Sequence, residues 1–143
     1  MGIPDANSAG FIHGGTVLRL VDEAAGLAAI KHAKRRVVTA GLDRMTFLTP
    51  IHVGELLRCS STVNAAWRTS MEVGVRVEAE NPYTGETRHT SAAYVTMVAV
   101  EDGQPVTVPR LIAESEDEMR RQREAELRRK NRLAERDQIL GSR

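Results

Sequence analysis

The stretch NSAGFIHGGTVLRLVDEAAG, from Asn7 to Gly26, places a His-Gly-Gly turn directly before a run of residues with helical spacing. Apolar residues recur at three- and four-residue intervals from Thr16 to about Ala33, which predicts an amphipathic helix. Many of them are alanines, which leave room for a sheet to approach closely. The stretch therefore predicts one apolar helix packed on a sheet.

Four segments after this helix have the spacing of β-strands and are separated by turn residues. They cover residues 36–50, 55–67, 70–80 and 87–100. The apolar side chains that alternate with polar or small ones are Val38, Ala40 and Leu42 in the first strand, and Val73, Val75, Val77 and Ala79 in the third. One helix followed by consecutive antiparallel strands predicts an α+β domain with the helix on one face of the sheet.

The chain divides by composition into a globular part, residues 1–110, and a charged tail, residues 111–143. Acidic residues come first in the tail and basic residues later, which suits the dipole of a helix. Ser115 and Glu118 have the spacing of a capping box. We therefore expect a solvated, ion-paired helix outside the core. The alternative is a long coiled coil, because sparse apolar residues keep a seven-residue spacing that only Glu126 interrupts.

The bulk composition narrows the class of protein. A chain of 143 residues is long enough for one domain with a real core, and 3% aromatic content makes that core aliphatic. A net charge of +1 argues against a nucleic-acid surface spread over the chain. Cys59 is the only cysteine, which excludes an intrachain disulfide and fits a reducing cytoplasm. We expect no signal peptide, membrane span or metal site, because no segment has the pattern of any of them.

The His-Gly-Gly turn suggests a site for a developing negative charge. The first amides of a helix have no partner inside the helix, and Gly14 and Gly15 have no side chains that would block a ligand. Such amides can donate to a carbonyl oxygen and stabilise the charge that develops there, as in an oxyanion hole. The alternative is a glycine-rich helix entry that binds nothing.

A carboxylate pair, Asp22 and Glu23, lies on the otherwise apolar helix. An inward-facing carboxylate costs free energy unless it is paired or functional, so Asp22 is a candidate catalytic group; Glu23 is the alternative inward residue. At 1.5 Å per residue, Gly15 and Asp22 lie roughly 10 Å apart along the axis, too far to flank one reacting carbon. Two antiparallel helices from two subunits would bring the two parts together twice, which predicts a dimer with shared sites.

Four ordered segments together resemble the hot-dog acyl-CoA thioesterase family, and most of all the cytosolic acyl-CoA hydrolases with their tandem-domain animal members. They are DANSAGFIHGGTVLRLVDEAAG, FLTPIHVGELL, RTSMEVGVRVEAENPYTGETRHT and AAYVTMVAVEDGQPVTVP. The resemblance covers residues 4 to about 112. It implies a central helix wrapped by a curved antiparallel sheet, and hot-dog pairs that share one sheet and often assemble as three dimers, a hexamer. It also implies hydrolysis of fatty acyl-CoA to free acid and CoA, without a separate cofactor.

The resemblance assigns roles to residues at matching positions. Asn7 and Asp22 occupy the places where the family has an asparagine and an aspartate that form the site from opposite protomers. Asp22 would act as general base on water or as nucleophile, and Asn7 would position the water or the thioester. The amides of Gly14 and Gly15 would hold the carbonyl oxygen. In tandem enzymes each domain can keep only one of the pair, whereas this chain has both.

Further candidates carry weaker signals. His13 either touches the substrate or is a structural residue of the turn. Arg68, Thr69 and Ser70 lie in a turn that resembles loops near the CoA nucleotide, and arginine suits phosphate; a solvated hairpin is the alternative. Arg88, at the start of the fourth strand, is a weaker candidate for CoA binding.

One feature departs from the family. Its members have a strand before the Pro-Asp segment, whereas only three residues precede Pro4 here. Either that strand is missing, which leaves an open edge near the loop of Asn7, or the true start lies upstream.

Two other functions compete with hydrolysis. A hot-dog dehydratase would need a catalytic histidine paired with an acid, a context that His13 lacks. A non-catalytic acyl-CoA-binding module, whose charged tail contacts a partner, would have no need of a carboxylate such as Asp22 near the thioester.

Overall fold

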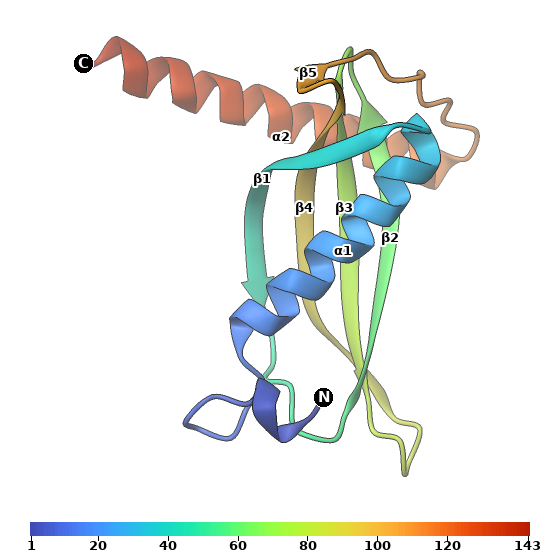
Figure 1. The fold of residues 1–143 in the computed structure, drawn as a ribbon, viewed down its shortest axis with the longest axis vertical. Helices are drawn as coiled ribbons and strands as arrows, with labels where there is room; N and C mark the ends of the chain where they lie inside the picture. Colours follow the sequence, from blue (N-terminus) through green and yellow to red (C-terminus); the bar gives the residue numbers. More distant parts are fainter.

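The computed structural model describes residues 1–143, in two helices, a short 3-10 helix and five strands (Figure 1). In chain order they are η1 (Ile3–Asp5), α1 (Gly14–Ala33), β1 (Arg36–Phe47), β2 (Leu56–Ala66), β3 (Ser70–Glu80), β4 (Thr87–Glu101), β5 (Gln104–Pro105) and α2 (Glu116–Gly141). The predicted helix, the four predicted strands and the helical tail are all present. The expected α+β class is confirmed.

The strands form one antiparallel sheet in the order β1-β4-β3-β2, and the short β5 pairs with β4. The strands β2, β3 and β4 pair in chain order, whereas β1 pairs with β4 and lies at the opposite edge from β2. The segment between β1 and β2, residues 48–55, therefore carries the chain from one edge of the sheet to the other. Both β1 and β2 are edge strands.

Helix α1 crosses one face of the sheet and supplies one wall of the core (Figure 1). It buries a residue at nearly every fourth position, the spacing of one helical face. These residues are Val17, Val21, Ala25, Ala29 and Ala33. They pack against aliphatic side chains of β3 and β4, chiefly Val73, Val75, Val77, Val95 and Met97. The core is aliphatic, as the composition predicted.

The edge strand β1 does not present the face that alternation predicted. Val37 packs against the core, while Val38 and Leu42 are exposed. The pairing of β1 with β4 shifts register twice, between Thr39 and Gly41 and between Asp43 and Thr46. Each shift inserts an extra residue and changes the face to which the following side chains point. Val38, paired with Val98, and Leu42, paired with the buried Val95, therefore lie on opposite faces of the sheet and do not form one core set.

Helix α2 lies behind the sheet, on the face opposite α1 (Figure 1). Its predicted N-cap is confirmed, because the Ser115 hydroxyl accepts from the Glu118 amide at 3.1 Å. The expectation of a wholly solvated helix is wrong for its middle part. Ala125 is fully buried, and Arg128 reaches Glu72 of β3, whose exposed fraction is 1%. Because α2 covers Glu72, β3 is buried on both faces at this point.

No helix of the structure combines the length and apolar character that a membrane crossing requires.

Candidate active site

The start of α1 leaves two amides free. The first backbone hydrogen bonds of the helix run from Thr16 and Val17 to the His13 carbonyl, at 3.0 and 3.3 Å. The amides of Gly14 and Gly15 have no acceptor in the chain. A Cβ at Gly15 would meet nothing within 4 Å, so a ligand can approach this backbone. The geometry required of an oxyanion hole is therefore available at the positive end of the helix dipole.

The loop before α1 is closed by Asn7. Its side-chain oxygen accepts from the amides of Ala9 and Phe11, at 3.0 and 3.1 Å, and its own amide donates to the Phe11 carbonyl at 2.7 Å. The next residue, Ile12, is tied to the Ile51 carbonyl at 2.8 Å. The loop is thus held by hydrogen bonds of its own and by one to the segment between β1 and β2. The side-chain NH2 of Asn7 has no partner in the chain and remains free to donate to a ligand.

Asp22 is an exposed residue of α1 with one defined partner. Its carboxylate accepts a hydrogen bond of 2.5 Å from the hydroxyl of Thr39, on the edge strand β1. The same hydroxyl lies 3.5 Å from the Met97 sulfur. Glu23, the alternative, is exposed and has no polar partner. The expectation of a buried carboxylate is wrong within one chain, because Asp22 stays exposed although Thr39 of β1 reaches it. We did not predict Thr39, since a threonine in a strand carries no signal of its own.

The other predicted residues divide between the two ends of the sheet. His13 is exposed and begins α1. Arg68, Thr69 and Ser70 form the β2–β3 turn at the opposite end, at the top of Figure 1. There the Arg68 carbonyl accepts from the Val108 amide after β5 and the Thr69 carbonyl from the Ala99 amide of β4, at 3.0 Å each. One chain therefore does not bring this turn to the Asn7 loop.

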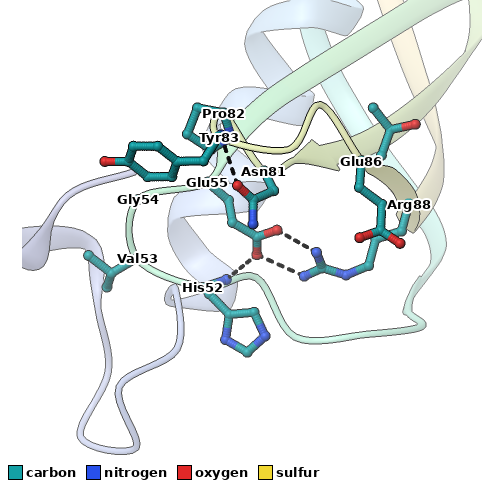
Figure 2. Close-up of a pocket in the computed structure, with 10 residues that line it drawn as sticks. His52, Val53, Gly54, Glu55, Asn81, Pro82, Tyr83, Glu86 and Arg88 are labelled. Carbon is teal, nitrogen blue, oxygen red and sulfur yellow. Dashed lines mark hydrogen bonds and ion pairs between the residues drawn. The ribbon is translucent and has the colours of Figure 1, made fainter.

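Arg88 is engaged in an ion pair with Glu55 (Figure 2). Both terminal nitrogens of its guanidinium donate to the carboxylate, one of them at 2.8 Å, and that nitrogen also donates to the Pro50 carbonyl at 2.6 Å. The hydrogen bonds from Arg88, together with one from the His52 amide at 2.7 Å, lower the pKa of Glu55 to about 2. CoA binding by Arg88 stays a prediction, and it would compete with this pair.

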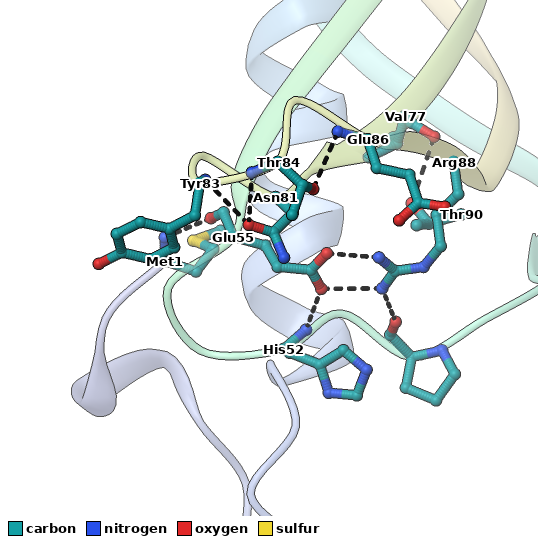
Figure 3. Close-up of polar contacts among 11 residues, drawn as sticks. Met1, His52, Glu55, Val77, Asn81, Tyr83, Thr84, Glu86, Arg88 and Thr90 are labelled. Carbon is teal, nitrogen blue, oxygen red and sulfur yellow. Dashed lines mark hydrogen bonds and ion pairs between the residues drawn. The ribbon is translucent and has the colours of Figure 1, made fainter.

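The Glu55–Arg88 pair forms one wall of a cavity of about 380 Å³ between the crossover segment and the β3–β4 turn (Figure 2). The turn is held by the Asn81 side chain, which accepts from the amides of Tyr83 and Thr84 at 2.9 and 3.3 Å (Figure 3). The ammonium group of Met1 donates to the Glu55 carbonyl at 2.9 Å. These contacts fix the crossover segment, and the hydrogen bond from Ile12 to Ile51 ties it to the Asn7 loop. No sequence pattern links Glu55 to Arg88, 33 residues away.

Comparison with known proteins identifies the family. The thioesterase superfamily matches residues 9–86. Protein VdlD of Helicobacter pylori is 40% identical over 116 residues, which are 81% of this chain and 67% of that protein. The crystal structure of an apo-hexameric acyl-CoA thioesterase superposes with a TM-score of 0.90 at 42% identity, over 94% of this chain and 87% of the other.

A second solved relative, the acyl-CoA hydrolase of Staphylococcus aureus, has been described with butyryl-CoA, CoA and CoA disulfide. It superposes with a TM-score of 0.89 at 32% identity, over 99% of this chain and 87% of that one. Structures are also known of three of its alanine variants: at an asparagine, at an aspartate fifteen residues later, and at a threonine seventeen residues after that.

The chain belongs to the thioesterase superfamily. The resemblance to the hot-dog acyl-CoA thioesterases, in fold and in sequence, is confirmed.

Proposed function

We propose that this protein hydrolyses acyl-CoA, with fatty acyl-CoA as the preferred substrates, to free acid and CoA, with Asp22 as the catalytic carboxylate. The observation that carries the proposal is a triplet of residues. Asn7, Asp22 and Thr39 are separated by fifteen and seventeen positions, and the first two flank a helix start with two free amides. The Staphylococcus aureus enzyme was altered at the same three residue types with the same spacings.

In the first form of the mechanism, the Asp22 carboxylate takes a proton from water, which attacks the thioester carbonyl carbon. The carbonyl oxygen becomes an oxyanion that accepts from the Gly14 and Gly15 amides. The intermediate then collapses and expels CoA as a thiolate, a good leaving group because thiol pKa values lie near 8.5. In the second form, Asp22 itself attacks, releases the thiolate and leaves a mixed anhydride that water hydrolyses. In either form, the Thr39 hydroxyl orients the carboxylate.

The two halves of the site are proposed to come from two chains. Asn7 and the helix start lie two turns of α1 away from Asp22, about 10 Å along the axis. The edge of β1 beside Thr39 is open and carries the exposed Val38 and Leu42, so a second copy can pair there and extend the sheet. We propose this dimer as the unit of a trimer of dimers. The hexameric state of a solved relative supports the assembly.

We also propose roles for the β2–β3 turn, for the two parts of the chain and for the compartment of the protein. Arg68, Thr69 and Ser70 would contact the CoA nucleotide of a site that the partner completes, because they lie at the far end of their own sheet. Residues 1–110 would form the catalytic unit and residues 111–143 an accessory helix. A lone thiol, Cys59, whose pKa is raised by burial, suits a reducing cytoplasm.

The test is thiol release from acyl-CoAs of increasing chain length, measured with a thiol-reactive dye. We expect catalytic turnover with wild type and with Glu23→Gln, which alters the neighbouring carboxylate only. Single turnover in H2-18O tests the nucleophile form: 18O in Asp22 would require an Asp22 anhydride that water opens at the Asp22 carbonyl carbon, which the general-base form does not produce. Saturable acyl-CoA binding without thiol release would replace this proposal with that of a binding module.

A further inference from the structure

Helix α2 is anchored to the outer face of the sheet by a buried ion pair. Arg128 donates from Nε and Nη2 to the two oxygens of Glu72, at 2.9 and 2.7 Å, and Asn64 donates to the same carboxylate at 3.0 Å. The guanidinium lies 3.6 Å from the centre of the Tyr94 ring. A Cβ at Gly74 would approach the Asn64 amide to 2.7 Å, so this glycine makes room for the network. The anchor fixes where α2 crosses the sheet.

From this anchor the helix runs toward the β1 edge and past it. Arg132, one turn beyond Arg128, lies 3.6 Å from Asp43 of β1. Every residue from 134 to 143 is exposed. Figure 1 shows the C-terminal part of α2 projecting beyond β1. The last turns of α2 therefore have no sheet of their own chain beneath them.

These last turns nevertheless keep the apolar stripe that faces the sheet. Ile139 and Leu140 lie within about 60° of Ala125 around the helix axis, whereas Leu127 lies about 160° away. Ala125 is the residue that the sheet buries, yet Ile139 and Leu140 are 47% and 58% exposed. A helix that ended in solvent would gain nothing from this continuation.

The length of the projecting part matches a sheet that continues across β1. Residues 133–141 span about 13 Å at 1.5 Å per residue. Strands lie about 4.8 Å apart, so this length crosses two to three strands. The same edge carries exposed Val38 and Leu42.

We propose that the last turns of α2 lie on the outer face of a second copy of this chain, next to its β1, with Ile139 and Leu140 as the contact. The inference rests on the proposed pairing of β1 with β1 of a partner. The two-fold symmetry of that dimer makes two such contacts, so α2 of each protomer packs on the sheet of the other. Helix α2 is then an assembly element.

A photo-crosslink tests the contact directly. Leu140→p-benzoylphenylalanine would be assembled from mixed light and 15N-labelled chains, so that mass spectrometry separates crosslinks between chains from those within one. We expect crosslinks between chains to the outer face of β1 and β4. The matched control, Leu127→p-benzoylphenylalanine, lies on the opposite face of α2 and should give none to that surface. Crosslinks confined to one chain, or equal yields at the two positions, would overturn the proposal.

A second measurement separates this inference from the dimer itself. Paired substitutions Ile139→Glu and Leu140→Glu should weaken the dimer at least about tenfold by analytical ultracentrifugation, a loss of about 1.4 kcal/mol. Leu127→Glu should leave the dissociation constant unchanged. If Val38→Glu disrupts the dimer but the paired substitutions leave it intact, the proposed contact of α2 with the partner is wrong and the β1 interface stands. A chain that forms no dimer by any edge would overturn both.

Discussion

At the scale of single residues, Asp22 combines two properties that catalysis requires: an accessible carboxylate and a fixed orientation. Its hydrogen bond from Thr39 crosses from β1 to α1, so the position of the carboxylate depends on how these two elements pack. The free amides at Gly14 and Gly15 belong to the same helix but to its first turn. The helix thus carries both kinds of group, separated by a distance that one active site cannot span.

Asp22→Asn keeps the shape of the side chain and removes the ionised carboxylate. We expect kcat for thiol release to fall by about 10²- to 10⁴-fold. Binding of CoA, measured by calorimetry, should change little because the proposed contacts of the nucleotide do not include Asp22. Thr39→Val should produce a smaller loss in kcat, since the hydroxyl orients the carboxylate without transferring a proton. An Asp22→Asn enzyme as active as Glu23→Gln would contradict the assignment.

Glu55 makes the fold sensitive to acid. Its pKa falls from an ordinary 4.5 to about 2, mainly through the hydrogen bonds from Arg88, so the ionised form is stabilised in the folded state. A depressed carboxyl pKa contributes stability above the ordinary value, and this contribution is lost as pH falls from about 4.5 to about 2. This contribution of Glu55 to the free energy of unfolding is of the order of 3 kcal/mol or less.

Glu55→Gln should therefore lower the free energy of unfolding at pH 7 and flatten its decline between pH 4.5 and pH 2. Urea denaturation at several pH values measures both effects. Glu86→Gln is the matched control, because Glu86 is an exposed carboxylate of the same cavity wall. Parallel pH profiles for wild type and Glu55→Gln would show that the pair does not contribute to stability.

At the scale of elements, α2 is attached to the sheet through Glu72, a buried carboxylate of β3 whose positively charged partner, Arg128, lies on α2. Glu72 is 1% exposed; Asn64 of the neighbouring strand β2 donates to it, and it meets Arg128 only because α2 covers β3. A buried pair of this kind adds little over an apolar contact, but removal of one partner is destabilising because the other is left unpaired. The ion pair also fixes the register of α2 on the sheet.

Arg128→Ala should lower the free energy of unfolding by about 1–3 kcal/mol, because the buried carboxylate of Glu72 then lacks its charged partner. Arg123→Ala, an exposed arginine of the same helix, should change it by less than about 0.5 kcal/mol. Truncation after Ala113 sets the upper limit of this loss in the free energy of unfolding. If the loss of Arg128 cost more, α2 would simply detach from the sheet and let water reach Glu72. A cost for Arg128→Ala above that of truncation, or equal to that of Arg123→Ala, would contradict this account.

At the scale of the whole molecule, the open edge of β1 connects the candidate active site at Asp22 with the proposed dimer. The edge lies beside Thr39, which donates to Asp22, so a partner that pairs there arrives next to the proposed catalytic carboxylate. The partner's Asn7 loop and helix start would then complete the site. Each dimer would have two such sites, related by the two-fold axis.

Subunit mixing tests this arrangement. Asn7→Ala and Asp22→Asn are each expected to be impaired, and a mixed dimer has one site with both lesions and one with neither. With random pairing about half of the dimers are mixed and half of their sites are intact, so activity should recover to about a quarter of wild type. Exchange verified by mass spectrometry without recovery would mean that the two residues act from the same chain.

The helix and the four main strands were predictable, because each depends on residues near one another in the chain. Asp22 was a candidate from its place on an apolar helix and Asn7 from the family resemblance, and the roles of both stay predictions. Periodicity reports which side of an element is apolar, and the His-Gly-Gly turn marks a helix start. The alternation in β3 correctly assigned Val73 and Val77 to the core.

The pairings that connect distant residues were not predictable. Thr39 meets Asp22 across 17 residues, Arg88 meets Glu55 across 33, and Arg128 meets Glu72 across 56. A charged residue on the polar side of a strand is predicted to be solvated, and only the position of α2 makes Glu72 a buried one. Likewise the register shift between Thr39 and Gly41 puts Val38 and Leu42 on opposite faces of the sheet, because pairing with β4 and not local composition sets those faces. Local spacing therefore decides which elements form, while packing between elements decides which polar groups are buried, paired or left free to react.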